Sequence, residues 1–122
     1  MISLVNLLLE QHRAFAGTRQ SGAPLITVVN SKVFKGASVR GNPIYTISNN
    51  KLFKGTAVAG SPLATLSGDL IFLGTAVSGA PLARIKNTFS LKGTAVAGTP
   101  VVTVPSGDVV TLFAATYHAL MS

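Results

Sequence analysis

The sequence predicts an all-β fold, a closed ring of five two-stranded repeats around a small barrel. The first observation is a pattern, G-x-x-x-x-G-x-P, that recurs five times at intervals of 19 residues without insertion or deletion. The second is that Thr, Val, Ile, Leu and Phe dominate the strand positions of each copy, while the repeated Pro would break any helix. The third is that equivalent positions carry like side chains, as internal symmetry requires.

The pattern residues account for ten of the twelve glycines and five of the six prolines, so the repeat is not an accident of composition. We predict that they are structural bends. The second Gly of each copy needs a backbone conformation closed to other residues, and the Pro begins the return strand where no N–H is needed. They are Gly17, Gly22 and Pro24; Gly36, Gly41 and Pro43; Gly55, Gly60 and Pro62; Gly74, Gly79 and Pro81; and Gly93, Gly98 and Pro100.

Residues 1–122 form one domain in three parts. In residues 1–13, the stretch SLVNLLLEQHR predicts a short helix with Ser3 as its N-cap. Residues 14–108 hold the five repeats; in the third copy we expect strands at 52–58 and 63–67 around the Gly-x-Pro break. Tight turns follow at Asn49-Asn50, Gly68-Asp69, Asn87-Thr88 and Ser106-Gly107.

Residues 109–122 carry two predictions. Val109–Phe113 continues the β pattern, and one interpretation pairs it with the first copy as the closing strand of the ring. The stretch AATYHALMS that follows is compatible with a C-terminal helix.

Two sets of like residues predict the core. The first set lies two positions before the first Gly of each copy and comprises Phe15, Phe34, Phe53, Phe72 and Leu91. The second set lies four positions after the Pro and comprises Val28, Ile47, Leu66, Ile85 and Val104. A further layer comprises Val39, Val58, Val77 and Val96, with Gln20 as the exception in the first copy. An open β-solenoid is the alternative architecture, but we favour a closed ring because closure removes the unpaired strand edges.

The repeated motif F-K-G-x-x-V-x-G-x-P-L-x-T-I resembles the repeats of the β-flower proteins, whose short tandem repeats form hairpin petals around a shallow barrel. The copy VFKGASVRGNPIYTISNNK is closest, and the likeness runs from Ala14 to Asp108. The chain departs from the family in having Ala64 and Ala83 where an aromatic residue is usual, and in having five copies where a fourfold form is familiar. The family resembles the tubby-like barrels, some of which bind phosphoinositide membranes, so the resemblance implies a membrane role at the level of the fold alone.

The charge of the chain favours an anionic partner. Ten basic residues oppose three acidic ones, giving +7, in a chain that is 48% hydrophobic and 11% charged. Lys35, Lys54 and Lys92 share the position before the first Gly, and Lys32 and Lys51 share another; with Arg40 they are the candidate lipid- or anion-binding residues. Leu73 and Ala16 interrupt the first set, and a solvated rim that keeps the protein in solution is the alternative interpretation.

Little in the sequence points to chemistry. Glu10, Asp69, Asp108, His12 and His118 are the only groups that titrate near or below neutrality, and both aspartates adjoin turn glycines. No Cys is present, and two His without a carboxylate make an incomplete metal site. We therefore expect no catalytic residue, no metal, no cofactor and no enzyme activity.

The apolar runs near the ends are shorter than the roughly 20 residues of a membrane-spanning helix. No basic residue precedes Leu4, as a signal peptide would require. We expect a cytoplasmic protein without a transmembrane helix. Its basic residues would allow it to associate peripherally with a membrane.

The leading hypothesis is a non-catalytic binding or scaffold module that associates with anionic lipid headgroups. The alternatives are a self-assembling structural subunit, hence a homo-oligomer, and a multivalent lectin-like or nucleic-acid module; the charge does not exclude nucleic acid.

Overall fold

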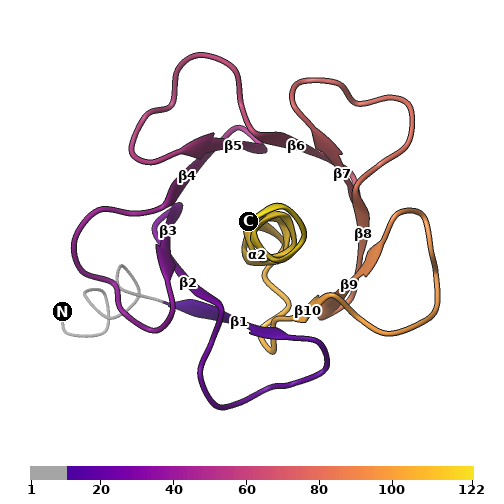
Figure 1. Ribbon diagram of the computed structural model, residues 1–122, viewed down its shortest axis with the longest axis horizontal. Helices are drawn as coiled ribbons and strands as arrows, with labels where there is room; N and C mark the ends of the chain where they lie inside the picture. The colour runs from indigo at the N-terminus through magenta and orange to yellow at the C-terminus, as the bar shows by residue number, and fades with distance from the viewer. Residues whose placement is uncertain (1–10) are drawn as a thin grey trace, which may run out of the picture.

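The computed structural model describes residues 11–122 and confirms the ring of five hairpin repeats around a barrel (Figure 1). Ten antiparallel strands close on themselves in the order β1-β10-β9-β8-β7-β6-β5-β4-β3-β2, so an open solenoid is not needed. They are β1 (His12–Ala16), β2 (Ile26–Val29), β3 (Lys32–Lys35), β4 (Tyr45–Ser48), β5 (Lys51–Lys54), β6 (Ala64–Ser67), β7 (Leu70–Leu73), β8 (Ala83–Lys86), β9 (Phe89–Lys92) and β10 (Val102–Thr103).

Residues 1–10, which hold most of the helix predicted within residues 1–13, lie outside the described residues. His12 and Arg13, which were placed in that helix, belong to β1 instead.

Two kinds of connection alternate around the ring. Tight turns join β2 to β3, β4 to β5, β6 to β7 and β8 to β9 at one end of the barrel, which we call the turn end. Long loops leave from the other end, the petal end, and Figure 1 shows them projecting outward as petals. The five petals are residues 17–25, 36–44, 55–63, 74–82 and 93–101.

The glycines and prolines of the repeat shape the petals. The strand expected over 52–58 ends at Lys54, because Gly55 has φ +66° and turns the chain out of the sheet. Gly60 has φ +84°, as predicted for the second Gly. Leu63 N then donates to Leu52 O at 2.7 Å, so the ladder resumes one residue after Pro62, which has no N–H to offer.

The predicted tight turns are correct at three of their four places. Asn49 and Asn50 both have positive φ, 52° and 62°, which is the two-residue turn that suits the twist of a hairpin. The turn expected at Ser106-Gly107 is wrong as a hairpin. Gly107 N donates to Val104 O at 2.8 Å, and the chain there bends toward the helix that follows.

The ring closes between β1 and β10, with Phe15 opposite Thr103 and Ala16 opposite Val102. The closing strand expected at Val109–Phe113 is therefore wrong. Those residues begin helix α2 (Val109–Met121), and the expected C-terminal helix is confirmed. Asp108 is its N-cap: the carboxylate accepts from Thr111 N at 3.0 Å and from Thr111 Oγ1 at 2.7 Å.

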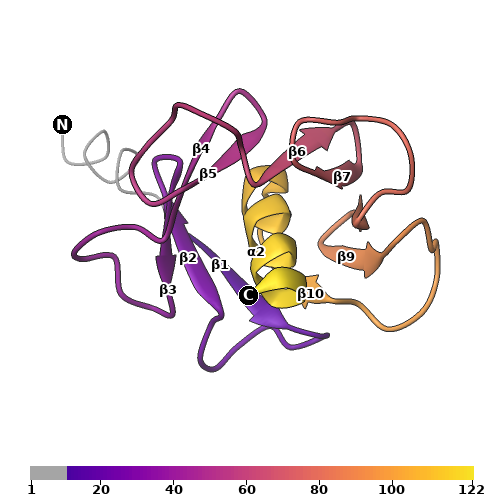
Figure 2. The same cartoon turned by 45° about the horizontal axis from the view of Figure 1, so that its top comes forward.

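Helix α2 runs through the inside of the barrel from the turn end to the petal end (Figures 1 and 2). Residues Thr111–Thr116 are buried in succession. The barrel wall surrounds the helix, so this part of it has no polar face.

Three rings of inward-facing residues surround the helix. The predicted ring of Val28, Ile47, Leu66, Ile85 and Val104 is confirmed as core, and two further rings join it. These are Ala14, Val33, Leu52, Ile71 and Ser90, and Ile26, Tyr45, Ala64, Ala83 and Val102. The polar exception, Ser90, is fully buried with its Oγ 2.7 Å from Oγ1 of Thr116, which is also 2.6 Å from Leu112 O.

The predicted Phe layer is also buried, but on the outer face of the wall. Phe34 lies opposite Thr27 in the ladder, and Thr27 Oγ1 donates to Gly36 O at 2.7 Å, tying the sheet to the start of a petal. Thr46, Thr65 and Thr103 repeat this bond with Gly55, Gly74 and Gly17. Arg84 takes the Thr position in the remaining copy.

The third predicted layer is wrong as a core element. Val58, Val77 and Val96 lie on petals and are 55%, 54% and 59% exposed. They follow the first Gly of the repeat, after the chain has already left the sheet.

Candidate binding site at the petal end of the barrel

Lys35, Lys54 and Lys92, which we call the lysine ring, are the last residues of β3, β5 and β9. They lie opposite Ile26, Tyr45 and Ala83, which belong to the core inside the barrel. Residues directly opposite each other on antiparallel strands project to the same face. The lysine ring therefore rises from the inner face of the wall at the petal end, around the mouth where α2 emerges.

The other basic candidates do not join this ring. Lys32 and Lys51 start β3 and β5 beside the tight turns, at the opposite end of the barrel. Because strand side chains alternate between faces, both share the outer face with the neighbouring Phe of their strands. Arg40 lies on the second petal and is exposed. The structure thus divides the predicted basic set into an inner ring of three lysines and three separate outer residues.

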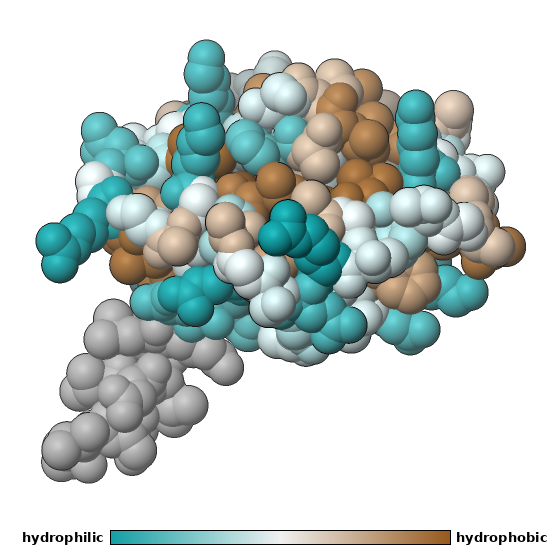
Figure 3. All heavy atoms as spheres, turned by 60° about the horizontal axis from the view of Figure 1, so that its bottom comes forward, coloured by the Kyte–Doolittle hydropathy of each residue, from teal (hydrophilic) through white to brown (hydrophobic). Residues whose placement is uncertain are grey.

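Apolar side chains form the inner border of the mouth. The residue after each repeat Pro is partly buried and packs against the core; these residues are Leu25, Ile44, Leu63, Leu82 and Val101. Leu73, at the lysine position of its copy, is 46% exposed, and Met121 at the end of α2 is 48% exposed. Figure 3, in which the face toward the reader in Figure 1 is turned upward, shows apolar surface along the upper side with hydrophilic side chains standing around it.

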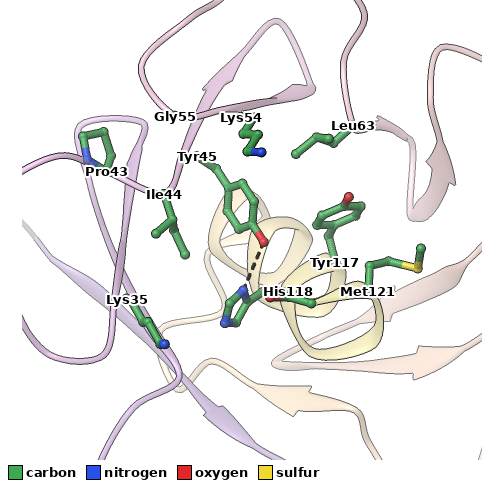
Figure 4. Close-up of a pocket in the computed structure, with 11 residues that line it drawn as sticks. Lys35, Pro43, Ile44, Tyr45, Lys54, Gly55, Leu63, Tyr117, His118 and Met121 are labelled. Atoms are coloured by element: carbon green, nitrogen blue, oxygen red, sulfur yellow. Dashed lines mark hydrogen bonds between the residues drawn. The ribbon is translucent and has the colours of Figure 1, made fainter.

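One side of this mouth is hollowed into a pocket of about 600 Å³ between the second and third petals. Lys35, Lys54, Ile44, Leu63, Tyr45 and Met121 are among the residues that line it (Figure 4). The helix packs most extensively against β1, β10 and β8, and it packs against β4 about as much as against β2 and β9. The pocket lies beside β4 and β5, away from the three strands that the helix packs against most.

Tyr45, Tyr117 and His118 form the aromatic floor of the pocket. Tyr45 Oη and His118 Nδ1 are 3.1 Å apart, and the Tyr45 and Tyr117 rings meet edge to face with centroids 5.7 Å apart. Burial raises the pKa of the Tyr45 phenol, while a hydrogen bond with Ser122 opposes this in part. Burial and, to a lesser degree, the charge of Lys35 lower the pKa of His118 below its ordinary value of 6.5.

Both pKa directions favour the neutral forms of Tyr45 and His118 near neutral pH. In the hydrogen bond between Tyr45 Oη and His118 Nδ1, the tautomer of the ring decides which atom donates. The pocket combines two ammonium groups and these neutral polar rings with an apolar wall.

The helix contributes to the electrostatics of the mouth. Its C-terminal end, which carries the negative pole of the helix dipole, lies at the petal end, where the strands that carry the lysine ring end. The two side-chain carboxylates of residues 11–122, Asp69 and Asp108, belong to a tight turn and to the helix N-terminus, both at the turn end.

The two histidines do not meet. His12 lies at the turn end, with Nδ1 2.9 Å from Ser106 Oγ and Nε2 3.9 Å from Asp108 Oδ1, whereas His118 lies at the petal end. Within residues 11–122 no three side chains of the metal-binding types gather in one place. The aromatic floor was missed in the sequence, although Tyr45 is the one Tyr within the repeats and marked its copy as different.

No protein-family model, curated protein or solved structure matches this chain. The fold and site define a class: a closed hairpin-repeat barrel filled by its own C-terminal helix, with a basic and apolar mouth. Membership of the β-flower family stays a prediction. In residues 11–122, no helix combines the length and the apolar character needed to cross a bilayer.

Proposed function

We propose that the protein is a non-catalytic module that attaches to anionic lipid surfaces through the petal end of its barrel. The observation that carries this proposal is the lysine ring on the inner rim of an apolar mouth. Such a surface offers cations to lipid phosphates and carboxylates, while exposed Leu73 and Met121 offer apolar contact to the interface.

The expected binding is weak and electrostatic. A Lys near an anionic membrane contributes about 1 kcal/mol, so three contribute about 3 kcal/mol, or roughly a hundredfold in partitioning. Attraction of this kind falls with salt because the screening length is about 8 Å at physiological ionic strength.

Vesicle co-sedimentation tests the proposal with a matched pair of triple variants. Lys35→Gln, Lys54→Gln and Lys92→Gln together should reduce binding to vesicles containing phosphatidylserine by about a hundredfold. Lys32→Gln, Lys51→Gln and Arg13→Gln remove the same charge from the outer face of the wall and should have a much smaller effect. Equal losses from the two triples, or equal binding to neutral vesicles, would refute the petal-end surface as the attachment site.

Self-association is a second candidate function, favoured by the exposed valines that recur at one position of three petals. Val58, Val77 and Val96 would bury apolar surface between copies of the chain. Sedimentation should then show a mass that rises with concentration, and Val58→Ser, Val77→Ser and Val96→Ser together should abolish the rise. A constant monomer mass for the parent chain contradicts this function.

A further inference from the structure

We infer that the pocket between the second and third petals binds one anionic amphiphile, with its head between Lys35 and Lys54 and its alkyl chain along Ile44, Leu63 and Met121. This inference rests on the proposed function, because it uses the same mouth, and it names a discrete ligand class within it.

The first argument is the place and the size of the pocket. It lies at the interval of the mouth that contains Tyr45, and its volume is about 600 Å³. The equivalent residues in the next two copies are Ala64 and Ala83. A volume of this size is within the usual range of small-molecule sites, about 300–1,000 Å³.

The second argument is the sign of the polar groups. Lys35 and Lys54 reach the pocket from neighbouring repeats, on either side of Tyr45 (Figure 4). The His118 ring adds a polar group to the pocket beside Lys35. Asp69 and Asp108 lie at the opposite end of the barrel, so the negative charge that faces these lysines is that of the C-terminal end of α2, at Ser122. An anionic head such as a phosphate monoester offers oxygens that can accept from either ammonium group.

The third argument is the apolar wall. Ile44 and Leu63 follow the repeat prolines of adjacent petals, and Met121 closes the opposite side from the helix. A bare anion would leave this wall in contact with water, whereas an alkyl chain would cover it. The pairing of a cationic entrance with an apolar wall selects an amphiphile over a free anion.

Isothermal titration of the full-length chain with monomeric dodecyl phosphate tests the inference. Two comparison probes separate the contributions of charge and chain. Inorganic phosphate has the charge without the alkyl chain, and dodecyl maltoside has the alkyl chain without the charge. We expect binding of dodecyl phosphate, at least tenfold weaker binding of either comparison probe, and a gain of up to about fourfold per methylene from octyl to dodecyl phosphate. Equal binding of inorganic phosphate, or of the maltoside, would overturn the amphiphile assignment.

The repeat supplies matched controls for each half of the site. Lys54→Gln should weaken dodecyl phosphate binding at least tenfold, and Lys92→Gln, at the same repeat position outside the pocket, should change it less than twofold. Leu63→Ala should reduce the chain-length dependence, while Leu82→Ala, its counterpart two strands further on, should not. If the two variants of either pair changed binding equally, the ligand would be held by diffuse attraction and not in the pocket, and the inference would be overturned.

The two proposals fail separately. Vesicle attachment depends on all three lysines, whereas the pocket depends on Lys35 and Lys54. Vesicle binding without monomeric amphiphile binding overturns the pocket and leaves the proposed function standing. Amphiphile binding without vesicle attachment supports the pocket and overturns the membrane role.

Discussion

Thr116→Val tests whether the helix occupies the barrel in the observed orientation. Thr116 and Ser90 are both fully buried, and the Thr116 hydroxyl lies near two acceptors, Leu112 O and Ser90 Oγ. Its single proton can serve only one of them. Both hydroxyls are satisfied when Thr116 donates to Leu112 O and Ser90 donates to Thr116 Oγ1.

The magnitude follows from which hydroxyl is left without a partner. Thr116→Val keeps the shape but leaves the Ser90 hydroxyl buried and unpaired, which costs about 1–3 kcal/mol. Ser90→Ala leaves Thr116 bonded to Leu112 O and should cost about 0.5–1.5 kcal/mol. The double variant should lie close to Ser90→Ala alone, so the coupling energy between the two sites equals the cost of Thr116→Val, about 1–3 kcal/mol.

Urea unfolding of the parent, both single variants and the double variant gives the cycle directly. Thr116→Val combined with Thr65→Val, which is on the outer face of the wall, is the control and should be additive. Additivity within about 0.5 kcal/mol for the Thr116 and Ser90 pair would refute the placement of this helix face against β9.

Three further predictions concern the backbone, the helix cap and pH. Gly60→Val should cost about 1–3 kcal/mol through strain at φ +84°, with no crowding, since nothing lies within 4 Å of a Cβ there. Pro62→Ala should cost less, because it acts mainly on the unfolded chain; an unchanged melting temperature for Gly60→Val in parallel thermal melts would contradict the strain. Asp108→Ala should lower the free energy of unfolding by about 1 kcal/mol through loss of the N-cap, measured by urea unfolding, with Asp69→Ala as an exposed turn control. His118 has a lowered folded pKa, so the folded state binds fewer protons than the unfolded state, and stability should fall as pH drops below 6.5. Thermal melts across that range should show a shallower fall for His118→Gln, and an identical slope would contradict neutral His118 in the folded protein.

The repeat made the ring predictable because one local rule, applied five times, leaves few other solutions. Gly60 and Pro62 define a bend, and the 19-residue period places the same bend in every copy. Burial of one residue such as Val28 then implies burial of its four counterparts. Closure was also predictable, since it removes the edges that an open array would expose.

The helix inside the ring was harder to predict. Val109, Val110 and Thr111 have β propensity, and a helix enclosed by a barrel carries no polar face to produce a periodic signal. The N-cap at Asp108 and the empty centre of the ring determine the outcome, and the second of these is a property of the assembled barrel.

About half of the candidate site could be predicted from the sequence. The period identified Lys35, Lys54 and Lys92 as equivalent, but the sequence alone did not separate them from Lys32. That separation follows from strand boundaries, because residues 32 and 35 are an odd number of positions apart and point to opposite faces. The pocket could not be foreseen, since it lies between the wall and the helix and depends on how these two pack.

The closure of the barrel by β1 and β10 fixes the number of repeats. In an open array, a copy can be gained or lost at an end with little effect on the others. Here the circumference grows with the strand count, and the interior holds one helix packed against all three rings. A ring of six repeats would have an interior wider than α2 can fill. A ring of four repeats would have an interior too narrow to hold α2. Duplication of single repeats, the usual way such arrays lengthen in evolution, is therefore barred unless the helix changes with it.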